Sequence, residues 1–444
     1  MDRIRYHLID NGSDTVIFFC DDLSILKVQN DEIERYKDVL DGNRTNADKE
    51  WYKTIQHTIL NNISDINDVS EDDFDFSTLI LHISNDCNMR CEYCFASHGL
   101  YKSKKGLMSK ETAIKTLELF YKKYKSIREI KFFGGEPLLN AVVIETVCQK
   151  VTEMYKCGLI SAMPRFKIIT NGTILSDRII QMVKKYSVQV VFSIDGPDFI
   201  HDEQRYFEEK KPSYSMVMNN FKRLQKETQM KQPCSVEITY TQKHLNNGFD
   251  MARLAEYFYK EMNIPIGRIN ISLVYLDKSS PLALTSSEHI LKDYVLKIVN
   301  NQKEMGEFLG DLKIQRLLFC LKNRKKHADY ICPAGESWAA VSSTGDIYPC
   351  LMFTDNHEFY MGNIEMGENF FDSQSYKKIR KCFQNSYILS KESCQNCFAN
   401  NLCSQCAGIN YFQTGDISKS NESFCDSMRL VSEVLICAVA DGLF

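Results

Sequence analysis

From residue 78 onward, short apolar runs alternate with longer amphipathic stretches. The runs are rich in β-branched and aromatic residues, and the stretches between them carry apolar positions at helical spacing. This alternation predicts a parallel sheet, and we expect an α/β fold, a partial (β/α)6 barrel of the TIM type. The predicted strands cover residues 78–84, 129–134, 166–171, 188–194, 235–241 and 268–276.

The chain before this alternation has a different pattern. A helix is predicted at 30–42, and the acidic, polar segment at 61–76 indicates a linker. Ahead of the helix, short apolar runs separated by turn signals predict small strands. These strands cover residues 6–10, 15–20 and 23–29.

The last third of the chain divides into a bridge and a cysteine-rich part. Residues 278–325 have a charged, helical pattern, and the sequence after Cys332 becomes rich in loops and cysteines. Such a small domain is typically held together by metal instead of by a large core. We therefore expect a small N-terminal unit at 1–72, the barrel at 73–300, and the bridge with the cysteine-rich domain at 301–444.

Composition and charge exclude several classes of protein. Of the 444 residues, 44% are hydrophobic and 25% charged, and a net charge of −4 with scattered lysines and arginines offers no basic surface for nucleic acid. No apolar stretch is long enough for a transmembrane helix or a signal peptide. We expect a cytoplasmic protein with neither a nucleic-acid nor a membrane partner.

Seventeen cysteines are many for a reducing compartment, where disulfides do not persist. Thiolates are soft donors that suit iron–sulfur clusters or zinc. One group lies within 87–94 and a second between 332 and 425, so two metal regions are predicted. Five other cysteines lie in or beside apolar runs and are expected to be small buried hydrophobes: Cys20, Cys148, Cys157, Cys234 and Cys437.

The first group, Cys87, Cys91 and Cys94, has the spacing C-x3-C-x2-C and follows the first predicted barrel strand. Three thiolates on one short loop can hold three irons of a cubane and leave the fourth iron open, as a catalytic zinc site keeps one position free. A zinc site is the alternative. It normally requires a fourth ligand, for which His98 is a weak candidate.

The segment Cys87-Asn-Met-Arg-Cys91-Glu-Tyr-Cys94-Phe resembles the signature of the radical S-adenosylmethionine (SAM) family. The resemblance implies a [4Fe–4S] cluster whose open iron binds the amino and carboxylate groups of SAM. It also implies reductive cleavage of SAM to a 5′-deoxyadenosyl radical that removes a hydrogen atom from the substrate. An external electron donor of the flavodoxin or ferredoxin class would be a partner.

Other positions at strand ends are similar to further family motifs. Gly134, Gly135 and Glu136 begin a GGEP element, which in the family holds the SAM amino group; a plain strand-to-helix turn is the alternative. The resemblance implies that Ser193 and Arg205 bind the SAM carboxylate or ribose. The alternative roles are a helix cap for Ser193 and a surface charge for Arg205. Three further residues are cofactor-binding candidates. Asp195 belongs to the same motif as Ser193, and Asn171 follows a strand and is expected to line the same pocket. Tyr93 is expected near the adenine, with core packing as the alternative.

The C-terminal cysteines resemble a SPASM domain, an extension of radical SAM enzymes that carries auxiliary [4Fe–4S] clusters. By that pattern one cluster has four ligands: Cys394, Cys397, Cys403 and Cys425. The other has three: Cys332, Cys350 and Cys406. Three [4Fe–4S] clusters are thus implied in all, and two zinc sites are the alternative for this region.

The sequence departs from the SPASM pattern at the cluster with three ligands. No cysteine follows Cys332 within a few residues, where the family's usual fourth ligand lies, and the gap before Cys406 is one residue short. Cys382 or Cys320 could close this cluster. Otherwise its open iron could bind a substrate thiolate.

The three N-terminal strands and their helix resemble the winged-helix-type elements with which peptide maturases bind a leader peptide. Such elements add the peptide as a strand to an exposed sheet edge, and we expect the leader beside Ile25–Gln29. A structural cap on the barrel is the alternative.

Two enzyme classes and one other class remain. The first is a peptide maturase that forms a crosslink, a cysteine thioether, in a ribosomally made precursor. The second is an oxidase of the anaerobic sulfatase-maturing type. The third is an electron-transfer or sensor protein, which would not cleave SAM.

Overall fold

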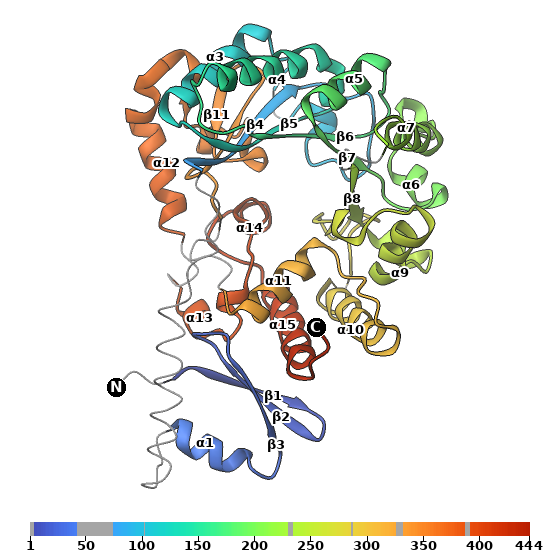
Figure 1. The fold of residues 1–444 in the computed structure, drawn as a ribbon, viewed down its shortest axis with the longest axis vertical. Helices are drawn as coiled ribbons and strands as arrows, with labels where there is room; N and C mark the ends of the chain where they lie inside the picture. Colours follow the sequence, from blue (N-terminus) through green and yellow to red (C-terminus); the bar gives the residue numbers. More distant parts are fainter. Residues whose placement is uncertain are drawn as a thin grey trace.

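The computed structural model describes residues 4–41, 74–101, 103–229, 234–285, 287–325, 332–386 and 391–444. Its largest element is a sheet of nine strands in the order β12-β11-β10-β4-β5-β6-β7-β8-β9 (Figure 1). The strands β4 to β9 are successive parallel neighbours, which confirms the six predicted barrel strands. They are β4 Phe76–Ser84, β5 Ile127–Gly134, β6 Arg165–Thr170, β7 Gln189–Ser193, β8 Cys234–Tyr240 and β9 Ile269–Leu273.

Helices cover the outer face of this sheet (Figure 1). Burial alternates along β8, where the outward residues are buried and inward residues such as Glu237 are partly exposed. Along this strand the barrel has an apolar side under its helices and a polar inner side. The outer helices are α3 Lys110–Lys123, α4 Ala141–Lys156, α5 Asp177–Tyr186, α6 Asp198–Gln204, α7 Tyr214–Glu227, α8 Gln242–Asn246 and α9 Met251–Glu256.

The cysteine-rich segment begins inside the barrel sheet, which its sequence did not reveal. Strand β10 (Trp338–Val341) pairs in parallel with β4, and the antiparallel strands β11 (Asp346–Tyr348) and β12 (Gly362–Asn363) follow. The nine residues of β4 are all buried, so its free edge in a partial barrel needs a partner. The C-terminal strands supply that partner and tie the two regions into one sheet.

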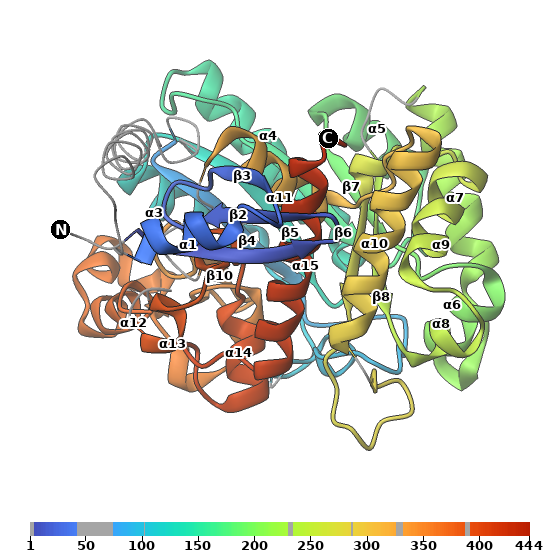
Figure 2. The same ribbon diagram turned by 90° about the horizontal axis from the view of Figure 1, so that it is seen from below.

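A second sheet lies at the opposite end of the molecule from the barrel (Figure 1). Its three antiparallel strands and one helix confirm the N-terminal prediction: β1 Tyr6–Asn11, β2 Asp14–Phe19, β3 Ile25–Gln29 and α1 Ile33–Asp41. One face packs on α1 and the other on the C-terminal helix α15 (Glu422–Ala440), a helix that was not predicted from the sequence (Figure 2).

The predicted helical bridge consists of α10 (Ser287–Met305) and α11 (Leu312–Asn323), both of which contact α15. The remaining helices are short: α12 Gln374–Gln384, α13 Glu392–Gln395 and α14 Ala407–Thr414. Among the described residues, no helix is both long and apolar enough to cross a membrane.

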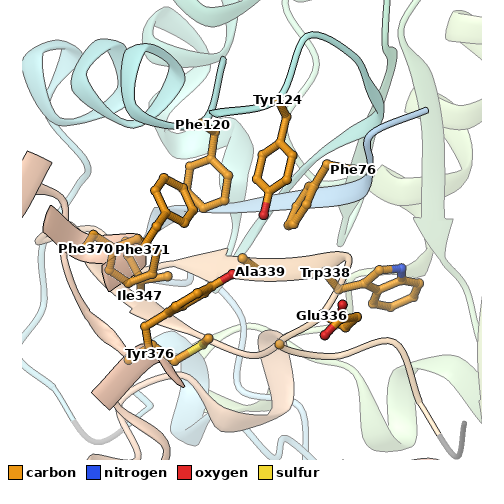
Figure 3. Close-up of a pocket in the computed structure, with 12 residues that line it drawn as sticks. Phe76, Phe120, Tyr124, Glu336, Trp338, Ala339, Ile347, Phe370, Phe371 and Tyr376 are labelled. Carbon is orange, nitrogen blue, oxygen red and sulfur yellow. The ribbon is translucent and has the colours of Figure 1, made fainter. Parts of the chain in front are cut away.

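Aromatic side chains fill the junction between the barrel and the C-terminal strands (Figure 3). Phe370 is 1% exposed, and its ring lies 4.9 Å from those of both Phe371 and Tyr376. The cavity they border measures about 10 Å³, which holds about one water molecule. This space is a packing seam and is too small for a substrate.

We predict that Phe370→Ala destabilises the protein by about 3–5 kcal/mol, because a buried ring is replaced by a cavity. Phe412 on α14 is 57% exposed, so Phe412→Ala should change stability by less than about 0.5 kcal/mol. Thermal unfolding under anaerobic conditions, compared at equal iron content, checks both. Equal unfolding temperatures for the two variants would contradict the assignment of this region as a packing seam.

Candidate functional site

The first cysteine loop follows β4 and is held by backbone hydrogen bonds to the segment after α6. Arg90 N–H donates to the Tyr206 carbonyl at 2.7 Å, and Glu92 N–H donates to that of Gln204 at 2.9 Å. Within the loop, the His98 N–H points at the Cys94 sulfur, 3.3 Å away. His98 contributes this backbone group while its side chain is exposed.

The sulfurs of Cys87, Cys91 and Cys94 lie within electrostatic reach of one another. Burial, then the Glu136 carboxylate and the neighbouring sulfurs, raise the pKa of Cys87 to about 12, and burial also raises the pKa of Cys91. A bound cation would compensate the charge of thiolates held this close together, so the loop is suited to a metal cluster. No three Cys, His, Asp or Glu side chains of the described residues form a single-ion site.

Two glycines bring the end of β5 against this loop. A Cβ atom on Gly134, which has a φ of +137°, would lie 2.3 Å from the Ser84 carbonyl oxygen. A Cβ on Gly135 would lie 2.3 Å from the Asp86 carbonyl oxygen and 2.8 Å from the Cα of Gly99. The absence of side chains at these two glycines lets the end of β5 approach the cysteine loop.

Glu136 lies buried beneath the loop and accepts three hydrogen bonds. Its Oε1 accepts from Leu138 N–H at 2.9 Å and Thr170 Oγ1 at 2.8 Å, and its Oε2 accepts from Asn171 N–H at 2.7 Å. Burial raises the pKa of Glu136 to about 6 despite these donors. A carboxylate has about four acceptor positions, so one remains for a further donor.

Asn171 links this pocket to the cysteine loop. Its Nδ2 donates to Asn88 Oδ1 at 2.9 Å and lies 3.7 Å from the Cys87 sulfur, and its Oδ1 accepts from Thr173. Asn88 and Thr173, which hold the loop on β6, were not predicted as site residues from the sequence. The polar positions after a strand were the only signal for them.

Tyr93, Asp195 and Arg205 form one buried network. Tyr93 Oη donates to Asp195 Oδ2 at 2.6 Å, and Arg205 Nη1 donates to Tyr93 Oη at 2.5 Å. Asp195 also accepts from Gln204 Nε2 and from the Thr239 backbone N–H. Asp195 thus positions its neighbours from within the protein.

Arg205 keeps one donor free. Its side chain is buried, and its Nε has no hydrogen-bond partner among the described residues. An unpaired buried donor is costly, which indicates that an acceptor belongs there. Ser193 ends β7 opposite Glu237 of β8, and its partly exposed position faces the barrel interior beside this network.

The C-terminal cysteines act electrostatically on one another in two groups. Burial and the sulfurs of the other three members raise the pKa of Cys403 to about 12, and the pKa of Cys425 is also raised. That group comprises Cys394, Cys397, Cys403 and Cys425. Burial and then the sulfur of Cys406 raise the pKa of Cys332 to about 11. The pKa of Cys350 is raised by burial and then by the sulfurs of Cys332 and Cys406.

Neither Cys382 nor Cys320 acts electrostatically with the group of three. Cys382 is exposed beside Asp416 and Glu358, and buried Cys320 lies near Arg316. A residue that we had not considered, Tyr275, lies after β9 within electrostatic reach of Cys406, and burial raises its pKa to about 12.

Of the five cysteines expected to be buried, Cys20, Cys148 and Cys234 are buried, and Cys437 is partly exposed. The prediction was wrong for Cys157, which is exposed. It caps the C-terminal end of α4, beyond the last buried residue of that helix, Met154.

The chain is similar to known proteins in both cysteine regions. Residues 81–241 match the Radical SAM superfamily, and residues 332–398 match the SPASM iron–sulfur cluster-binding domain. The radical SAM cyclopropyl synthase TigE of Paramaledivibacter caminithermalis is 25% identical over 80% of this chain and 73% of its own length. A cysteine-type anaerobic sulfatase-maturating enzyme of Clostridium novyi is 23% identical over 80% of this chain and 93% of its own.

The fold is also that of a solved structure, native anSMEcpe with bound AdoMet and the Cp18Cys peptide. The TM-score is 0.65 at 20% identity, over 83% of this chain and 99% of that one. Together with the two matched regions, these likenesses identify the chain as a radical SAM enzyme with a C-terminal SPASM domain.

Proposed function

We propose that Cys87, Cys91 and Cys94 hold a [4Fe–4S] cluster and that the pocket beside them holds SAM. The pocket fits both charged ends of that molecule. Glu136 has an acceptor position left for an ammonium group, and the unpaired Nε of Arg205 suits a carboxylate. When bound, this pair supplies a 5′-deoxyadenosyl radical that takes a hydrogen atom from the substrate.

The chain's own residues then have separate tasks. Glu136 and Arg205 would bind and orient SAM, and Ser193 and Asn171 would border the same pocket. Asp195 and Tyr93 position Arg205 through the 2.6 and 2.5 Å hydrogen bonds. Asp195 already accepts three hydrogen bonds from its own chain, so we assign it the positioning of Tyr93 and Gln204, with one acceptor position left for the cofactor.

We propose two auxiliary [4Fe–4S] clusters, which makes three in all. Cys394, Cys397, Cys403 and Cys425 would hold one, and Cys332, Cys350 and Cys406 the other. The mutual effects on thiol pKa within each group support this division. These clusters would supply an acceptor for the electron that an oxidation releases, and an external flavodoxin or ferredoxin would reduce the first cluster in the cytoplasm.

The reaction that we propose is formation of a thioether crosslink in a ribosomally made precursor peptide. The observation that carries it is the group of three sulfurs, which neither Cys320 nor Cys382 joins in the described part of the chain. An iron left open there suits a substrate thiolate. The peptide bound to the structurally similar anSMEcpe supports a peptide substrate.

The N-terminal sheet is our proposed site for the leader of that peptide. In this sheet β3 has a partner on one side, β2, within the described residues. Residues Ile25–Gln29 would receive the leader as an added strand.

The second candidate is an oxidase of the sulfatase-maturing type, favoured by the similarity to the Clostridium novyi enzyme. Such an enzyme would act without a leader. A protein that only transfers electrons or senses redox state is the third, and it would not cleave SAM.

We predict that replacing Cys87, Cys91 and Cys94 together by alanine removes SAM cleavage and about a third of the bound iron, because one of three clusters is lost. Cys157→Ala, at the exposed end of α4, is the matched control and should keep both. Iron analysis and 5′-deoxyadenosine formation under dithionite check this. SAM cleavage by the triple variant would exclude the assigned loop.

SAM affinity should fall as the pH drops below about 6, because protonated Glu136 has lost the charge that favours the SAM amino group. Protonation of Glu136 can lower the affinity by up to about tenfold per pH unit below its pKa. Glu136→Gln should bind SAM weakly and lose this part of the pH dependence, whereas Glu153→Gln on the surface of α4 should retain it. Anaerobic calorimetry between pH 5 and 7.5 measures the profiles, and identical profiles for all three proteins contradict the role of Glu136.

A cysteine-containing precursor peptide encoded beside this gene should lose two hydrogens in mass when incubated anaerobically with the enzyme, SAM and reductant. A hydrogen atom, a proton and an electron leave as the sulfur–carbon bond forms, and one thiol becomes resistant to alkylation. Removing the leader should greatly reduce the yield. Conversion of a sulfatase peptide, with no change in the precursor, would favour the second candidate.

A further inference from the structure

The N-terminal region directly contacts the loop that carries the group of four C-terminal cysteines, which includes Cys394 and Cys397. The Arg5 guanidinium donates from Nη2 to the backbone carbonyl of Cys397, 3.0 Å away. In return, Asn401 Nδ2 donates to the backbone carbonyl of Cys20 at 2.7 Å. Figure 1 shows α13, which begins this loop, beside the sheet. Segments nearly 400 residues apart in sequence are thus hydrogen-bonded at the proposed cluster.

Ring stacking reinforces this contact. The imidazole of His7 lies parallel to the ring of Phe398, the residue after Cys397, with centroids 3.7 Å apart and planes at 4°. His7 Nε2 also lies 2.9 Å from Glu433 Oε1 on α15. The sheet is therefore held in register with the cysteine loop, and the position of Arg5 is fixed.

Arg5 brings a positive charge into the surroundings of these sulfurs. The buried thiol of Cys20 lies within electrostatic reach of both Arg5 and Cys397. Arg429 and Lys391 also act on this cysteine group, from the C-terminal region itself. Arg5 is paired with Asp21, Nη1 to Oδ1 at 3.0 Å, and its side chain is 34% exposed.

We propose that Arg5 is a positioning residue that raises the reduction potential of the cluster held by Cys394, Cys397, Cys403 and Cys425, a role that rests on the proposed function of these cysteines. Reduction adds a negative charge to a cluster. A guanidinium bound to the carbonyl of a ligand residue stabilises that charge, so the reduced state is favoured. Because Arg5 is partly exposed, the effect should weaken at high salt.

The ion pair with Asp21 allows an electrostatic role of Arg5 to be distinguished from a purely structural one. Arg5→Gln removes the positive charge and should lower the potential of this cluster. Asp21→Asn cuts the same ion pair but leaves the guanidinium uncompensated, so it should raise the potential. A purely structural role would shift both variants in the same direction.

The test is an EPR-monitored redox titration of the full-length, anaerobically reconstituted protein. Lys27→Gln is the matched control, because Lys27 lies on the same sheet and its ion pairs among the described residues are with Asp14 and with Asp441 at the end of α15, outside the cysteine loop. We expect shifts of opposite sign for Arg5→Gln and Asp21→Asn, smaller in 0.5 M salt, in the signal that Cys394→Ala abolishes. Lys27→Gln should leave that signal unshifted.

Two outcomes overturn the inference in distinguishable ways. Unchanged potentials, or shifts of the same sign, in a protein whose signal does vanish with Cys394→Ala would overturn the role of Arg5 alone. If no auxiliary cluster signal depends on Cys394, the ligand assignment fails and the role of Arg5 fails with it. Should Arg5→Gln not fold, the direction of the Asp21→Asn shift decides.

Discussion

The reaction centre depends on how closely three backbone segments approach one another. The end of β4, the end of β5 and the turn at Gly99 interlock at distances that leave no room for side chains at Gly134 and Gly135. This contact presses the cysteine loop onto Glu136 and encloses the carboxylate, whose burial is offset by three hydrogen bonds from its own chain. A charged ligand that reaches this pocket meets acceptors and donors already in place, and little free energy is lost in ordering them.

A second constraint is the continuity of the main sheet. A partial barrel leaves β4 with an open edge, and the C-terminal strands close it. Behind this join, His82 of β4 lies 2.9 Å from Thr354 Oγ1, and burial lowers the pKa of His82 to about 3, so the ring is neutral. Thr354 lies four residues after Cys350. The sheet and this buried contact together fix the first cysteine loop relative to the group that contains Cys350.

The sequence predicted the six barrel strands and the N-terminal strands, because each depends on local periodicity. It did not predict that β10 would join β4, since pairing between segments over 250 residues apart leaves no local signal. The roles of Asn88 and Gln204 were missed for the same reason, as each acts through a partner in a distant loop that follows β6 or β7. The prediction for Cys157 failed for a different reason. Its neighbours in sequence are apolar, but Cys157 lies just beyond the end of a helix and is exposed.

The group of three sulfurs argues for a thiol as the remaining ligand. Cys350 is buried, and its pKa is raised by burial and by Cys332 and Cys406, so these sulfurs favour a bound cation. The nearby oxygen group, Tyr275, has a pKa of about 12 and is protonated at neutral pH. A neutral phenol competes poorly with a thiolate for iron. Under the proposed function, a substrate cysteine would therefore meet little competition from Tyr275 at the open iron, whereas a fourth resident cysteine would have closed the site against it.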